Sequence, residues 1–193
     1  TTNNRINGAD GADILFNSSD AIHNTLGGGH ELWLDAGTGN IVADNIVELT
    51  ALTIDDYESG AVLGDGFTGA NDVTYGLLAI PGPLHIDAAG TVSGGNTILD
   101  DDISMSAARI IVEEAMVVSG VHTIDLTATG VGIPDEDGDI ILAEMVMSQA
   151  GDITLTADDD IVFAANGQIR TAGAVRLTAG ADGETERSIY ELA

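Results

Sequence analysis

The segment Ile124-Asp125-Leu126-Thr127-Ala128 decides the fold, because its order of apolar, polar, apolar, polar and Ala recurs along the chain. The other copies are LWLDA at 32–36, LTID at 52–55, LHIDA at 84–88, ISMSA at 103–107, ITLTA at 153–157 and VRLTA at 175–179. Successive copies start 20, 32, 19, 21, 29 and 22 residues apart. Alternation places Ile124 and Leu126 on one face of a strand and Asp125 on the other. Each copy is therefore predicted to be one short β-strand.

Short strands at a coil-sized period, separated by Gly, Asn and Asp, predict an all-β parallel β-solenoid (β-helix) of roughly 20-residue coils. We expect one solenoid domain over residues 1–193, with loop insertions around 56–83 and 130–150 where the period lengthens. The β-branched residues within 107–118 favour strand over helix there. The alternative fold is an antiparallel β-sandwich, which also uses short strands and turns but does not explain the period.

A longer match joins the two ends of the chain. The stretch DILF at 13–16 has Ile22 six residues after its Phe, and DIVF at 160–163 has Ile169 at the same offset. This match predicts that the two stretches occupy equivalent places in two coils. The chain starts with Thr1 rather than Met, so we expect a mature product or a segment of a longer protein.

Composition excludes several classes of partner. The chain has 32 Asp and Glu against 5 Arg and no Lys, a formal net charge of −27, and no Cys. Nucleic-acid binding and a polybasic membrane anchor both need a basic face, which five Arg cannot supply. No run approaches the roughly 18 apolar residues of a membrane span, so we predict neither nucleic-acid binding nor direct membrane insertion. Thiolate zinc sites and disulfides are impossible.

These repeats, above all those at 34–41 and 151–157, resemble the repeats of filamentous-haemagglutinin-like bacterial surface proteins. That resemblance implies right-handed coils and a secreted, cell-surface role as a structural or adhesive module, with no catalytic residues. The chain lacks the Asn-Pro-Asn-Gly motif of their secretion domain. The ends of a solenoid expose strand edges, which either more chain or a second copy must cover, and we expect self-association end to end.

Acidic residues at the corners suggest calcium. Asp135, Asp137 and Asp139 alternate in one turn, although Ile140 and Val146 stand where an EF-hand would have Gly and Glu. The triplets at 100–102 and 158–160 would crowd negative charge, which bound Ca²⁺ would relieve, so Asp158 and Asp160 are also candidate ligands. The alternative is that these carboxylates shape corners and stay hydrated.

Other functional signals are weaker. An outward Trp33 would contact a glycan or surface receptor, or be covered by a loop. The four His, including His85 and His122, are dispersed and predicted to be structural.

A carbohydrate-active β-helix enzyme using the Asp clusters is the alternative function, and it requires both triplets on one face. A row of Thr at 127, 156 and 178 suggests an ice- or mineral-binding face, but Asp and Ser interrupt it.

Overall fold

The computed structural model describes residues 4–7, 14–16, 31–35, 40–47, 51–54, 72–88, 90–130, 138–180 and 189–191. In these ranges all regular structure is β-strand, and every strand pairing is parallel. The all-β prediction is therefore confirmed, and the antiparallel alternative is wrong.

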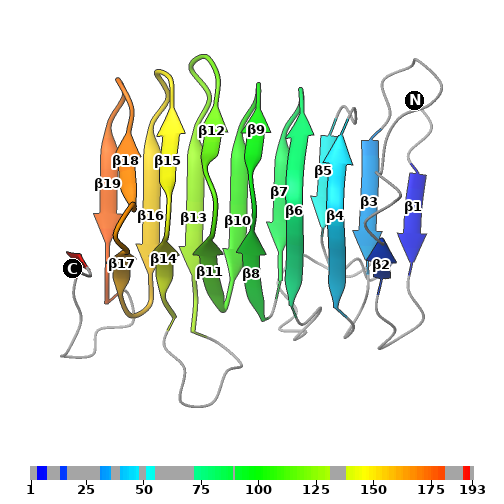
Figure 1. The fold of residues 1–193 in the computed structure, drawn as a ribbon, viewed down its shortest axis with the longest axis horizontal. Coiled ribbons are helices and arrows are strands. Elements are labelled where there is room, and N and C mark those ends of the chain that lie inside the picture. Colours follow the sequence, from blue (N-terminus) through cyan, green and yellow to red (C-terminus); the bar gives the residue numbers. More distant parts are fainter. Residues whose placement is uncertain are drawn as a thin grey trace, which may run out of the picture.

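One sheet contains the repeated segment (Figure 1). Its eight strands, in order across the sheet, are β1 (Asn4–Asn7), β3 (Glu31–Asp35), β5 (Ala51–Ile54), β7 (Leu84–Asp87), β10 (Ile103–Ala107), β13 (Ile124–Ala128), β16 (Ile153–Ala157) and β19 (Val175–Thr178). The first residues of all seven predicted copies align in one row from Leu32 to Val175. The sequence analysis missed β1, in which the polar Asn4 aligns with Leu32.

The second sheet contains the segments between these strands. Its twelve strands are β2 (Ile14–Phe16), β4 (Ile41–Val47), β6 (Val73–Ile80), β8 (Thr91–Gly94), β9 (Thr97–Leu99), β11 (Arg109–Val112), β12 (Met116–Val118), β14 (Ile140–Leu142), β15 (Met145–Ser148), β17 (Ile161–Phe163), β18 (Gln168–Arg170) and β20 (Ile189–Glu191). The first half of β6 (residues 73–75) pairs with β8, and its second half (residues 78–80) pairs with β9. Two short strands of the next rung therefore take the place of one long strand. The two stretches of the longer match form β2 (14–16) and β17 (161–163). Their first residues, Ile14 and Ile161, belong to one row of aligned residues across this sheet.

The chain passes alternately through the two sheets, and we call one strand of the eight-stranded sheet with the strands that follow it a rung. Figure 1 shows the rungs arranged in sequence order along the long axis. Parallel pairing places equivalent residues of adjacent rungs side by side at the ~4.8 Å spacing of sheets. Residues distant in sequence therefore become neighbours one rung apart.

The core is narrow and aliphatic. In β10, Ile103 and Met105 are 1 % and 2 % exposed while Ser104 between them is exposed. The inward side chains of both sheets form one hydrophobic cluster from Ile14 to Ile161. Burying each Ile or Leu contributes about 1.5–3 kcal/mol, so stacked rungs supply the stability that one rung lacks.

Three polar side chains, those of Tyr75, Thr97 and Ser148, are buried in the part of the chain that the structure describes. Tyr75 of β6 is 3 % exposed, and its hydroxyl lies 3.1 Å from Thr97 Oγ1. Burial raises the pKa of Tyr75 to about 12, against a smaller lowering by the Thr97 hydrogen bond. A Cβ atom at Gly94 would lie 2.5 Å from the Tyr75 hydroxyl, so this glycine makes room for the ring.

The two stretches expected to hold insertions contain strands. Strand β6 lies within 56–83, and β14 and β15 lie within 130–150. The other parts of these stretches include 56–71 and 131–137, which lie outside the described residues. The segment 107–118 contains the end of β10, then β11 and β12, so the preference for strand over helix is confirmed.

Candidate functional site

Two clusters of possible metal ligands lie at opposite ends of the strands. Asp101, Asp102 and His122 form one, and Asp139, Asp159 and Asp160 form the other; in each, one ligand atom per residue lies within 4.8 Å of the others. The first cluster lies where the chain passes from β9 to β10 and from β12 to β13. The second precedes β14 and β17, where the chain enters the twelve-stranded sheet. Figure 1 places these two kinds of corner at opposite edges of the molecule.

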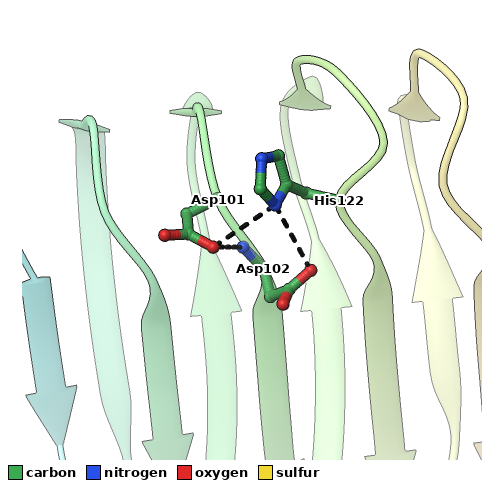
Figure 2. A group of neighbouring side chains, drawn as sticks. All are labelled: Asp101, Asp102 and His122. Atoms are coloured by element: carbon green, nitrogen blue, oxygen red, sulfur yellow. Dashed lines mark hydrogen bonds and ion pairs between the residues drawn. The ribbon is translucent and has the colours of Figure 1, made fainter.

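In the first cluster a histidine faces two carboxylates (Figure 2). His122 Nδ1 lies 3.3 Å from Asp101 Oδ1 and 3.7 Å from Asp102 Oδ1. The side chains of His122, Asp101 and Asp102 are 35 %, 37 % and 57 % exposed. The cluster therefore lies in a polar, solvent-accessible corner.

Strand register brings these residues together. Ile103 pairs with Ile124, and Leu99 pairs with Val118, which places the corner holding the two Asp beside the corner holding His122. Gly120 begins the turn before His122 with a φ of 69°, a left-handed conformation that glycine accepts most readily.

Hydrogen bonds on both sides fix the two corners. Asp102 Oδ1 accepts from the Thr123 backbone amide at 2.6 Å and from Thr123 Oγ1 at 3.1 Å. The His122 carbonyl accepts from Ser148 Oγ at 2.7 Å. A Cβ atom at Gly151 would overlap the same carbonyl, so the neighbouring corner fits closely only without a side chain there.

The second cluster joins two predicted ligands. The Asp160 backbone amide donates to Asp139 Oδ1 at 3.1 Å, which brings these two candidates together. Asp159 completes the cluster; it belongs to the triplet at 158–160, of which the sequence analysis named only Asp158 and Asp160 as ligands. Arg109 Nη2 lies 4.0 Å from Asp139 Oδ2, so a guanidinium already offsets part of the negative charge.

The remaining predicted site residues are placed differently. Asp158 is outside both clusters, and its Cβ would lie 2.7 Å from a Cβ atom added to Gly138. Asp135 and Asp137 lie outside the described residues. Trp33 lies in β3, aligned with Arg5 and Thr53, and its side chain is outside what the structure describes.

Corner Asp residues share one structural role. The side-chain oxygen of a corner residue accepts a hydrogen bond from a backbone amide of the next rung. The pairs are Asn40 with Asp72, Asp72 with Thr91, Asp102 with Thr123, Asp139 with Asp160 and Asp152 with Ala174. These contacts satisfy amides just before or at the start of a strand, and each links two rungs.

The two Asp triplets do not form a common site. One lies between β9 and β10 and the other between β16 and β17, at opposite strand ends. The carbohydrate-active alternative required both triplets on one face with carboxyl groups about 5–10 Å apart. That arrangement is not formed between the triplets.

Comparison of the chain with protein-family models, curated proteins and solved structures found no match. In the part of the chain that the structure describes, no helix has the length and apolar character needed to cross a membrane.

The sequence analysis predicted a structural role for His122 and did not anticipate that His122 faces Asp101 and Asp102. His122 lies one coil period after the acidic triplet, and that spacing is the signal that could have paired them. A search for complementary residues at the repeat period, rather than within one turn, would have found this cluster.

Proposed function

We propose that the chain is an extracellular structural or adhesive module, a right-handed parallel β-solenoid of roughly 20-residue coils that stacks end to end into a rod, filament or surface layer. Two observations support the solenoid. Equivalent residues align rung by rung in parallel, and the inward side chains of both sheets share one core. In repeat proteins of this kind each unit is stabilised mainly by its neighbours.

The proposal of stacking rests on apolar side chains that are exposed in the last rung. Val175 aligns with Ile153, yet Val175 is 46 % exposed and Ile153 is 0 % exposed. In the other sheet Ile189 aligns with Ile161, and the exposed fractions are 47 % and 0 %. Positions that are core in the preceding rung thus present apolar surface at this end, and we propose that a second copy covers it.

The acidity of the chain determines how the proposed stacking depends on salt. A net charge of −27 opposes association through repulsion between chains, which keeps a stackable rod soluble. At physiological ionic strength, salt largely screens the repulsion between exposed charges that lie more than about 8–10 Å apart. Assembly is therefore expected to increase with ionic strength.

Light scattering on a concentration series tests stacking, and the chain provides a matched control. Ile189→Asp places a charge on the last rung, whereas Ile98→Asp alters an equally exposed residue (45 %) of β9, which is paired on both sides. We expect the mass of the wild type and Ile98→Asp to rise with concentration, while Ile189→Asp stays monomeric. A wild type that is monomeric throughout, or equal effects of both variants, would contradict the proposal.

The adhesive role and the location at a bacterial cell surface rest on the resemblance of the repeats to filamentous-haemagglutinin-like proteins. The proposed partner is a glycan or surface receptor, with Trp33 as the predicted contact. Binding of the wild type and Trp33→Ala to immobilised glycans tests this role. Equal binding by both would remove Trp33 from the proposal.

Calcium is the proposed ion at the second cluster, because Asp139, Asp159 and Asp160 offer only oxygen ligands. The nearby Arg109 is expected to weaken its affinity. Melting temperature in CaCl₂, for the wild type and Asp159→Asn, tests the site. Absence of any calcium-dependent stabilisation in the wild type would remove calcium from the account.

A further inference from the structure

We propose that Asp101, Asp102 and His122 bind one late first-row divalent ion, such as Zn²⁺, and that this ion joins two successive rungs. Asp101 and Asp102 belong to the corner before β10, and His122 belongs to the corner before β13. This inference is independent of end-to-end stacking, because all three ligands come from the interior of one chain.

The donor set selects the class of ion. Ca²⁺ and Mg²⁺ prefer oxygen ligands alone, whereas an imidazole nitrogen suits zinc, copper, nickel and iron. His122 turns Nδ1 toward both carboxylates, as Figure 2 shows. The cluster therefore combines two carboxylates with a nitrogen donor and differs in kind from the all-Asp cluster.

The spacing of the donors fits a tetrahedral ion. With metal–ligand distances of about 2.0–2.2 Å, tetrahedral ligands lie roughly 3.3–3.6 Å apart. His122 Nδ1 lies 3.3 Å from Asp101 Oδ1 and 3.7 Å from Asp102 Oδ1. One ligand atom from each of the three residues lies within 4.8 Å of the others, so side-chain rotation completes the arrangement around one ion.

Neighbouring groups orient the ligands. Asp101 Oδ1 accepts from the Asp102 backbone amide at 2.8 Å, and Asp102 Oδ1 accepts two bonds from Thr123. An outer-shell hydrogen bond such as that to Asp101 holds a ligating carboxylate in place. Because two bonds from Thr123 occupy both lone pairs of Asp102 Oδ1, Asp102 ligates through its other oxygen, Oδ2, or gives up one of these bonds. The partial exposure of all three side chains leaves access for the ion and room for a water as the fourth ligand.

Local charge favours the cation at this corner. Asp100 adds a further carboxylate next to the cluster in sequence, and Arg109 lies at the opposite end of these strands. By contrast, Arg109 lies 4.0 Å from Asp139 of the second cluster.

Titration of the chelator-treated full chain tests the proposal. Zn²⁺ is followed by calorimetry, and Co²⁺ by its visible ligand-field absorption. We expect one ion per chain, tetrahedral-type Co²⁺ bands, and little competition from excess Mg²⁺. His122→Asn and Asp101→Asn are expected to lower Zn²⁺ affinity by more than the roughly 10–100-fold that loss of an outer-shell partner costs.

Two variants serve as controls. His85→Asn removes an exposed histidine of β7, and Asp139→Asn removes a carboxylate of the second cluster; both are expected to bind Zn²⁺ as the wild type does. Melting temperatures measured without metal show whether each variant is folded. If His122→Asn is unfolded, the Zn²⁺ affinity of Asp101→Asn tests the proposal instead. Absence of Zn²⁺ and Co²⁺ binding, or unchanged affinity in a folded Asp101→Asn, would overturn the proposal.

Discussion

The carboxylate of Asp152 accepts a hydrogen bond at 2.8 Å from the backbone amide of Ala174, 22 residues further along the chain. Asp152 precedes β16 and Ala174 precedes β19, so the bond crosses from one rung to the next. The same kind of bond joins Asp102 to Thr123 and Asp72 to Thr91. With Asp139, four Asp residues at the corners of the described residues therefore link one rung to the next.

Removing the acceptor of this bond is expected to destabilise the fold. Asp152→Ala leaves the Ala174 amide without its partner and should lower the free energy of unfolding by about 1.5–3 kcal/mol, the range for bonds to charged groups. Asp152→Asn keeps an oxygen acceptor and should cost less. Denaturant unfolding measures both, with Asp125→Ala on the outer face of β13 as control. Equal stability of Asp152→Ala and Asp125→Ala would contradict this role.

Shortening a side chain of the narrow core is expected to lower the free energy of unfolding more than removing a hydrogen bond at a corner. Leu126 is 0 % exposed in the middle of β13, which is paired on both sides. Leu126→Ala should lower the free energy of unfolding by about 2–5 kcal/mol, because the stacked rungs cannot collapse into the cavity. Thr127→Ala, at the next and partly exposed position, is the control and should stay within about 0.5 kcal/mol. A cost for Leu126→Ala no larger than for Thr127→Ala would show that Leu126 does not lie in the core.

The buried Tyr75 predicts a pH dependence at alkaline pH. Its folded-state pKa of about 12 exceeds the unfolded value of 10.0, so its contribution is complete below pH 10 and is lost as the pH rises toward 12. The loss is on the order of 3 kcal/mol, at about 1.4 kcal/mol per pKa unit. Unfolding of the wild type and Tyr75→Phe between pH 8 and 12 measures the difference. Parallel pH profiles of the two proteins would contradict the burial of this hydroxyl.

The close approach at Gly151 predicts intolerance of a side chain. A Cβ atom there would overlap the His122 carbonyl, which belongs to the backbone of the preceding rung and cannot rotate away. Gly151→Ala should therefore destabilise the protein by about 1–3 kcal/mol or more. Thermal unfolding checks this, and a melting temperature at or above that of the wild type would show that the two rungs are not in contact at this point.

Much of the fold could be predicted from one repeated segment. Alternation at 124–128 and its copies predicted every strand of the eight-stranded sheet except β1, and it aligned their first residues correctly. Strand β1 was missed because Asn4 occupies an apolar position of the pattern, so only pairing with Leu32 shows its place. The division of the second sheet into long and short strands depends on corners that no simple pattern marks.

The candidate sites were less predictable, because they form between rungs. Asp139 and Asp160 were proposed separately, and only stacking joins them. His122 was treated as structural because the four His are dispersed in the sequence, yet Asp101 Oδ1 lies 3.3 Å from its Nδ1 in space. Side chains one period apart become neighbours only once the register is known.

Small-angle X-ray scattering on a concentration series tests end-to-end stacking most directly, because it separates the length of a particle from its cross-section. The account predicts that the length of the scattering particle increases with concentration while its cross-sectional radius stays constant. It also predicts that Ile189→Asp abolishes this growth. A length that does not change with concentration, or growth in cross-section alone, would contradict end-to-end stacking.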